Sequence, residues 1–194
     1  EDLTMRYPDY AVFSEEIRKS ENMAREESGS SFALMHRAAE ALLDALLREV
    51  PDASNVLIAA GGGNNGGDGL ELAALLLERG IGALCILPKD PKPGTEAAEA
   101  LAHLRSAGGK PVREFPAPGQ LHGFDLIVDA VLGIGVRSPL REDAADFIRK
   151  INESGLRVLS VDVPSGLSAD SGAAPDGAVR AEWTVSLLGL HPGL

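Results

Sequence analysis

Residues 55–79 read NVLIAAGGGNNGGDGLELAALLLER, and this stretch indicates the fold class. A short apolar run leads into a glycine-rich turn, and the turn leads into a helical pattern of leucine and alanine. Similar apolar runs recur along the chain, and several are apolar almost throughout, as in strands covered on both faces of a parallel sheet. We expect strands at 55–60, 82–87, 111–115, 125–130, 157–163 and 183–188.

Helical patterns occupy the intervals between these runs, and we expect helices at 68–79, 95–106 and 142–154. Alternation of strands and helices at this spacing predicts an α/β fold with a mostly parallel, doubly wound sheet. Ahead of the sheet, Ser14 is expected to cap a first helix. Apolar residues three or four apart over 31–50 then predict an amphipathic helix that packs on the sheet or on a partner subunit. Residues 115–122 and 165–178 are expected to be loops.

Composition excludes several classes of function. The 194 residues include 18 basic and 29 acidic side chains, for a net charge of −11. This charge argues against nucleic acid or an anionic membrane as the main partner, because phosphate groups would be repelled. The amino-terminal residues do not form a signal-peptide pattern, and no apolar run approaches the ~18 residues of a membrane span. We therefore expect a soluble, cytoplasmic globular domain.

The cysteine and histidine content gives no sign of a transition-metal site. A single cysteine excludes an internal disulfide framework and a cysteine-rich zinc site. That residue, Cys85, lies within an apolar run and is expected to be a buried small hydrophobe. The four histidines, which are scattered without metal-ligand spacing, are His36, His103, His122 and His191.

The glycines after the first expected strand fit a nucleotide-binding turn. Gly61, Gly63 and Gly66 match the G-x-G-x-x-G pattern, in which glycines let the backbone approach a pyrophosphate at a helix N-terminus. A nicotinamide dehydrogenase also needs an acidic residue about 20 positions on, at the end of the second strand. Here that strand ends in LPK, with Asp90 the nearest acid. An ordinary dehydrogenase is therefore disfavoured.

Polar side chains accompany these glycines. Asn64, Asn65 and Asp68 place amide and carboxylate oxygens around a small space, which suits a ribose, an amide or a weakly bound cation. The alternative is structural, because Asn and Asp tolerate left-handed turns and Asp68 could cap the helix.

Two further expected strands end in polar residues. Asp129 is followed by a second glycine turn, and Asp162 is followed by a turn that contains Ser165. The carboxyl ends of parallel strands share one edge of the sheet, so we expect these residues to converge with Asn65 and Asp68. A carboxylate in such a cleft can act as a general acid or base. Each aspartate alone could instead be a turn former, and Ser165 has no base beside it that would make it a nucleophile.

Three segments taken together resemble a known family. GGGNNGGDGLELAALLLERG at 61–80, DLIVDAVLGIGVRSPL at 125–140 and VLSVDVPSGLSADSG at 158–172 resemble the ordered motifs of the NAD(P)H-hydrate epimerase family, the YjeF N-terminal domain. The resemblance runs from about Ser14 to Leu188. It implies a Rossmann-like three-layer αβα sandwich over 14–194, preceded by an extension at 1–13, in a single domain with an N-terminal helical region.

The family resemblance also implies an activity. Its members interconvert the R and S forms of hydrated NADH and NADPH (NADHX and NADPHX). A separate or fused dehydratase that uses ADP or ATP can then restore the cofactor. The hydroxyl of the hydrated ring lies next to an enamine nitrogen, which can expel it once an acid protonates it. Water then adds from the other face, and we hypothesise that Asp162 is the acid and base.

The site residues follow from matching the family motifs onto this sequence. A potassium ion would be held by Asn65, Asp129 and Ser165, whose oxygens suit a hard cation. The substrate would contact Asn64, Asn65, Gly66, Gly67, Asp68, Gly133, Ile134, Gly135, Val136, Arg137, Ser138, Pro139 and Asp162.

The chain departs from the family pattern away from these residues. His36 stands where the family usually has Glu, Ala39 replaces a usual Gly, and His191 stands where Lys is common. The chain stops short of the tail of a complete domain, so a truncated carboxyl end is expected.

Several questions stay open at the level of sequence. A non-catalytic binding or scaffold module of the same fold is the alternative to an epimerase. Arg79, Lys89 or Lys92 could reach a 2′-phosphate, so the preference between NADHX and NADPHX is undecided. The apolar face of the helix over 31–50 would also suit a homodimer.

Overall fold

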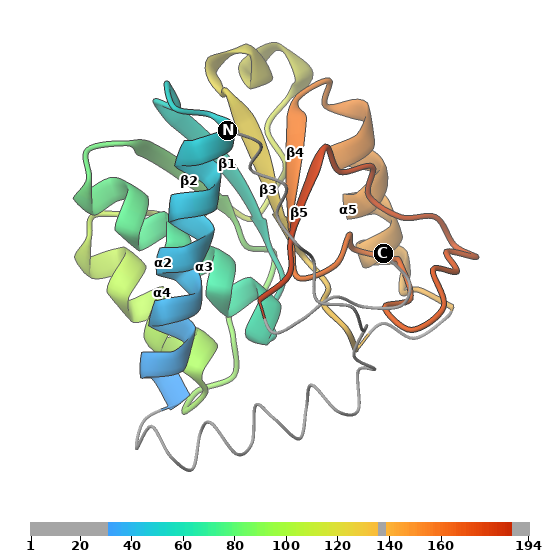
Figure 1. Ribbon diagram of the computed structural model, residues 1–194, viewed down its shortest axis with the longest axis horizontal. Helices are drawn as coiled ribbons and strands as arrows, with labels where there is room; N and C mark the ends of the chain where they lie inside the picture. The colour runs from blue at the N-terminus through green and yellow to red at the C-terminus, as the bar shows by residue number, and fades with distance from the viewer. Residues whose placement is uncertain (1–30, 136–138, 188–194) are drawn as a thin grey trace, which may run out of the picture.

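A computed structural model describes residues 31–135 and 139–187, and these form a five-stranded parallel sheet between layers of helices (Figure 1). The strand order is β2-β1-β3-β4-β5, and every neighbouring pair is parallel. The strands are β1 (Asn55–Ala60), β2 (Gly82–Ile86), β3 (Leu126–Ala130), β4 (Arg157–Val161) and β5 (Trp183–Val185). The predicted doubly wound α/β fold is confirmed. The extension at 1–13 and the helix expected after Ser14 lie outside the described residues.

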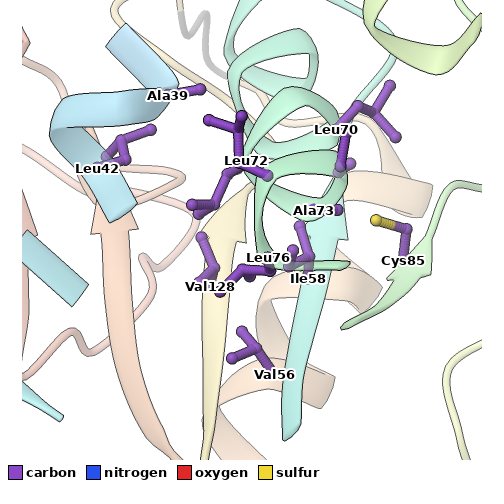
Figure 2. Packing of buried hydrophobic residues seen from close by; sticks show 14 of the residues in the cluster. Ala39, Leu42, Val56, Ile58, Leu70, Leu72, Ala73, Leu76, Cys85 and Val128 are labelled. Atoms are coloured by element: carbon purple, nitrogen blue, oxygen red, sulfur yellow. The ribbon is translucent and has the colours of Figure 1, made fainter. Parts of the chain in front are cut away.

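Three helices cover one face of the sheet. They are α2 (Ser31–Glu49), α3 (Asn64–Glu78) and α4 (Glu96–Ser106). Figure 2 shows side chains of α2 and α3, among them Leu42, Leu72 and Leu76, gathered over Ile58 and Val128 of the sheet. Alternate residues of the strands point to this face because side chains of a strand alternate between its two sides.

The apolar stripe of α2 is part of this core. Met35, Ala39, Leu42, Leu46 and Val50 are all buried within the chain itself. Of the two expected roles, packing on the chain's own core is the one observed. The stripe therefore no longer supports a homodimer.

The other face of the sheet is covered by α5 (Glu142–Glu153) and the short 3-10 helix η1 (Pro118–Gly123). Phe147, Ile148 and Ile151 of α5 pack with Leu57 of β1 and Ile127 of β3. The charged residues of α5 lie on its outer side, where Lys150 pairs with Asp146. This two-sided pattern agrees with the helix predicted over 142–154.

The strand predicted at 111–115 is wrong. Only Val112 pairs with β2, through its N–H to the Cys85 carbonyl and its carbonyl to the Leu87 N–H. The next bond of a parallel ladder would use the Leu87 carbonyl, but the Arg113 guanidinium donates to that oxygen at 2.9 Å. The segment therefore makes a single bridge on the open edge of β2.

Cys85 is buried in β2, and burial raises the pKa of its thiol to about 12. This agrees with its expected role as a small hydrophobe. None of the helices in the described segments is long and apolar enough to cross a membrane.

Candidate functional site

A pocket of about 690 Å³ lies at the carboxyl edge of the sheet. Its wall is formed by the segments that follow the strands, together with parts of α2 and α5. This is the edge at which parallel sheets commonly bind ligands. The predicted substrate-binding residues that line the pocket are Asn64, Asn65, Asp68, Gly133, Ile134, Gly135 and Asp162.

One side of the pocket is the first turn of α3. The helix begins at Asn64, with Gly63 as its N-cap, so the expectation that Asn64 to Asp68 form a loop before a helix starting at 68 is wrong. Asp68 is likewise not the helix cap. Gly63 provides no side-chain cap, and the first backbone N–H groups of a helix have no partner within it. The N-terminus of α3 can therefore bind an anion in the pocket.

The glycines of this turn allow close packing. A Cβ atom on Gly66 would lie 1.8 Å from the Gly61 carbonyl oxygen. A Cβ atom on Gly67 would lie 2.6 Å from the Met35 methyl carbon, so α2 packs directly on this turn. Both glycines are buried and neither is part of the pocket wall, so the substrate contacts expected of them stay a prediction. They act by shaping the turn that presents Asn64 and Asn65.

Asp129 and Ser165 form a buried pair next to the pocket. The Ser165 hydroxyl donates to Asp129 Oδ1 at 2.6 Å, and the Ser165 backbone N–H donates to Oδ2 at 2.9 Å. The Ser160 hydroxyl donates to the same Oδ2 at 2.8 Å. Both Asp129 and Ser165 are fully buried, and burial raises the pKa of the Asp129 carboxyl. The carboxylate thus has only neutral donors against its desolvated charge.

Asn65 reaches the same turn from α3. Its side-chain amide donates to the Leu132 carbonyl at 3.0 Å, and the Leu132 N–H donates to the Ser165 hydroxyl at 2.8 Å. Asn65, Asp129 and Ser165 therefore meet around the turn after β3, as the strand ends predicted. Their oxygens, together with backbone carbonyls, form a donor set that suits a hard cation.

Asp162 follows β4 on the pocket wall. Its φ is 67°, and among the described residues it alone is a non-glycine with a positive φ. Its N–H donates to the Val185 carbonyl of β5 at 2.8 Å, which helps hold this conformation. Left-handed backbone is uncommon outside glycine, and such residues cluster at functional sites. The carboxylate predicted to be catalytic therefore occupies a sterically special position beside the pocket.

The sequence profile described as "YjeF-related protein N-terminus" matches residues 31–193. The chain belongs to this family. The three ordered motifs lead to the same assignment.

Curated relatives match nearly all of this chain. A protein of Limosilactobacillus fermentum named NAD(P)H-hydrate epimerase is 35% identical, over 95% of this chain and 88% of its own length. A protein of Coxiella burnetii named bifunctional NAD(P)H-hydrate repair enzyme Nnr is 38% identical, over 92% of this chain. The match spans only 36% of the Coxiella protein. This chain therefore corresponds to one part of the bifunctional relatives.

A solved structure supports the fold. The crystal structure of yeast ynu0 superimposes with a TM-score of 0.80 and covers 95% of this chain and 83% of the yeast chain, at 24% sequence identity. At this identity the similarity establishes the common fold of the two proteins.

The other residues named from the sequence are Pro139, Val136, Arg137, Ser138 and Arg79. Pro139 is exposed and outside the pocket wall. Val136, Arg137 and Ser138 lie outside the described residues. Arg79 ends α3 at the opposite end from the pocket, so it is wrong as a contact for a 2′-phosphate.

Basic residues line part of the pocket despite the acidic composition of the chain. Lys89 and Lys92, which follow β2, and Arg141, which precedes α5, belong to its wall. Asp90, also in the wall, pairs with Arg113 at 2.8 Å, and this bond lowers the pKa of its carboxyl. Arg141 pairs with Asp143 of the same wall at 3.6 Å, and Asp68 and Glu96 also line it. Lys89 and Lys92 thus add positive charge to a wall that also carries acids.

Sequence patterns missed the contributions of three helices, among them α4, whose Glu96 lines the pocket. Leu34 and Met35 come from α2, and Arg141, Ala144 and Phe147 come from α5 or its cap. None of them follows a strand, so the strand-end rule that found the other residues could not find these.

Proposed function

We propose that this chain is an NAD(P)H-hydrate epimerase, an isomerase that interconverts the R and S forms of NADHX and NADPHX. The observation that carries this proposal is the position of Asp162 in one pocket with the uncapped N-terminus of α3. The pocket thus joins a site for a pyrophosphate to a carboxylate suited to proton transfer. The names of the curated relatives support the substrate class.

The dinucleotide would bind along the carboxyl edge of the sheet. Backbone N–H groups at the start of α3 would hold the pyrophosphate, and Lys89 and Lys92 would add positive charge. The hydrated nicotinamide ring would then lie near Asp162 and the turn after β3. Gly133 and Gly135 in that turn allow the ring to approach the backbone closely.

The chemistry needs one group that donates and then recovers a proton. In this proposal Asp162 donates a proton to the ring hydroxyl, and the ring nitrogen lone pair expels that hydroxyl as water. This leaves a cationic iminium ring beside the Asp162 carboxylate. Water adds to the opposite face of the ring, and its proton returns to Asp162. Atoms and charge balance, and only the configuration at the reacting carbon changes.

The proposal includes a potassium ion bound next to the pocket. Asn65, Asp129 and Ser165 would hold it, because the donor set is all oxygen and the desolvated Asp129 charge has only neutral partners. When bound, the cation supplies positive charge beside the loops that carry the substrate. These residues would keep the turns after β1, β3 and β4 in one arrangement.

A dehydratase is the proposed functional partner, on the same or a separate chain. The bifunctional name of the Coxiella burnetii relative supports this arrangement. A cytoplasmic location is proposed with it, on the acidic composition and the single cysteine, which suit a reducing compartment.

The proposal is tested with a mixture of R and S hydrates, an excess of an S-specific dehydratase with its nucleotide, and potassium buffer. The rate at which NADH absorbance returns after the S form is spent measures epimerisation of the R form. We expect the chain to accelerate this phase well above the spontaneous rate. Asp162→Asn should lower the acceleration at least ~100-fold, because it removes the proton-transfer group.

Asn is a matched substitute because it also tolerates left-handed backbone. Asp170→Asn, at an exposed position on the same connection between β4 and β5, serves as the control and should keep wild-type turnover. No acceleration by the folded protein would favour the non-catalytic binding module instead. Wild-type turnover in Asp162→Asn would leave the epimerase in place but reject the role of Asp162.

A further inference from the structure

Three side chains from three helices meet on the helical face of the molecule, outside the pocket. His36 comes from α2, Glu71 from α3 and His103 from α4. They are 35 and 32 residues apart in sequence, and they meet because the three helices lie side by side on this face (Figure 1). Neither the motifs nor the proposed epimerase chemistry uses them.

Glu71 is the centre of this cluster. Its side chain is fully buried, and its Oε1 lies 2.6 Å from His36 Nδ1 and 2.8 Å from His103 Nδ1. Its Oε2 is buried and has no hydrogen-bond partner among the described residues. A buried carboxylate with one oxygen contacted twice and the other left without a partner is costly. A further ligand that binds the Glu71 carboxylate would reduce this cost.

The outer nitrogens of both imidazoles face carboxylates. His103 Nε2 lies 3.1 Å from Glu78 Oε1, and His36 Nε2 lies 3.9 Å from Glu40 Oε1. Histidines that bind metal ions commonly donate their second ring N–H to a carboxylate, which fixes the tautomer and orients the ring. Here both Nδ1 atoms lie close to the buried carboxylate, and His103 Nε2 has such an outer partner in Glu78. His36 Nε2 lies beyond hydrogen-bond distance of Glu40, so that contact is an ion pair at most.

We propose that His36, Glu71 and His103 bind a divalent transition-metal ion, and that zinc suits the site best. The three ligand atoms lie within 4.8 Å of one another, close enough to share one ion. Two imidazole nitrogens and one carboxylate are a known ligand set for zinc, whereas magnesium and calcium prefer oxygen alone. The ion would bind the Glu71 carboxylate, whose second oxygen is otherwise unsatisfied. The histidine side chains are 39% and 27% exposed, so the ion can enter from solvent.

Without a metal ion, protons would have to hold the cluster together. Each Nδ1 would then carry a hydrogen toward Oε1, and His103 would need a second hydrogen on Nε2 to contact Glu78. That arrangement leaves Oε2 of Glu71 without a donor, so it does not account for the buried oxygen. An ion shared by the two Nδ1 atoms and the Glu71 carboxylate would instead give that carboxylate a further partner.

The proposed ion would join α2 to α3 and α4. Met35, beside His36 on α2, lines the pocket and packs on the position of Gly67. The site is thus a structural clamp behind one wall of the pocket. It is independent of the proposed epimerase, and its test does not use catalytic activity.

The test uses tag-free protein that has been treated with a chelator and titrated with Co²⁺, whose visible absorption reports nitrogen and oxygen ligation. We expect one ion per chain, displaced by Zn²⁺, and a higher melting temperature in the presence of Zn²⁺. His103→Gln, His36→Gln and Glu71→Gln should each weaken binding at least ~100-fold. Glu78→Gln should weaken it about 10-fold, as expected for an outer partner.

His122→Gln, at an exposed histidine of η1, is the control and should bind as the wild type does. The two partly exposed histidine variants keep the test valid if Glu71→Gln does not fold. Absence of one-to-one binding in the folded wild type would overturn the proposal, as would equal loss of binding in His122→Gln. Either result would identify the cluster as a hydrogen-bonded network alone.

Discussion

At the scale of single residues, Asp125 shows how one carboxylate fixes the start of a strand pair. Its Oδ2 accepts the backbone N–H of Ser54 at 2.7 Å and that of Asn55 at 2.8 Å. The Ser54 hydroxyl adds a third bond at 3.1 Å. Asp125 thus ties the residue before β3 to the beginning of β1. The backbone bonds from Ser54 and Asn55 lower the pKa of its carboxyl.

Asp125→Asn should lower the free energy of unfolding by about 1 kcal/mol at neutral pH, because a neutral acceptor replaces a charged one at a partly exposed position. The pKa of Asp125 is lowered in the folded state, so its contribution is present above the unfolded pKa of about 3.9. It is lost as pH falls through the folded pKa. Urea unfolding at neutral and acidic pH measures the difference between wild type and variant.

The control is Asp52→Asn, at an exposed position in the turn after α2. It should leave stability within about 0.5 kcal/mol of the wild type. The role of the charge would be contradicted if Asp125→Asn and the wild type differed in free energy of unfolding by the same amount from neutral pH to below pH ~3.

At the scale of elements, the first turn of α3 is where local propensity and packing disagree. Its glycines weaken an isolated helix, since glycine is about 1 kcal/mol less favourable than alanine in a helix interior. The turn is nevertheless helical because Gly66 lies against the backbone of Gly61 and Gly67 against Met35. Tertiary contact thus outweighs the glycine signal, which by itself indicated a loop.

Gly66→Ala should therefore destabilise the protein by about 2 kcal/mol or more, although alanine has the higher helix propensity. The added methyl group would lie 1.8 Å from the Gly61 carbonyl oxygen, and backbone must move to relieve this contact. Thermal unfolding followed by circular dichroism measures the effect.

Gly119→Ala is the matched control, because a Cβ atom there meets no atom within 4 Å. This substitution should leave the free energy of unfolding close to that of the wild type. If Gly66→Ala were as stable as the wild type, the first turn of α3 would open easily, and packing would not determine its helical conformation.

At the scale of the whole molecule, the proposed potassium site joins segments that are distant in sequence. Asn65 belongs to α3, Asp129 to β3, and Ser165 to the connection after β4. An ion that binds only the folded arrangement stabilises it by mass action, by about 1.4 kcal/mol at ten times its dissociation constant. The melting temperature of a chain of this size should then rise by roughly 4 °C.

The measurement compares melting in potassium chloride with melting in choline chloride at equal ionic strength. Potassium should raise the midpoint for the wild type and not for Ser165→Ala, which lacks one ligand oxygen. Ser168→Ala, on the same connection, should respond as the wild type does. Identical midpoints in the two salts for the wild type would reject the potassium site.

Much of the fold could be predicted from local patterns. The strand at 55–60 matches β1 in both bounds, and the helix expected at 95–106 matches α4, with Thr95 as its N-cap. The segment at 111–115 failed because Arg113 uses the carbonyl that would extend pairing. Such competition depends on neighbours in space, so the periodicity of the segment does not reveal it.

In the candidate site, too, some residues could be predicted from local patterns and others could not. Asp129, Asp162 and Ser165 could be found because Asp129 lies near the end of β3 and the other two follow β4, and parallel strands end at one edge whatever their order. The walls from α2 and α5 follow no such rule. Hydrophobic periodicity and strand-end chemistry are local properties of the chain, so they indicated the fold class and one edge of the pocket. The cluster of His36, Glu71 and His103 and the helical turn at Asn64 arise from packing between distant segments, which only the assembled helices and sheet bring together.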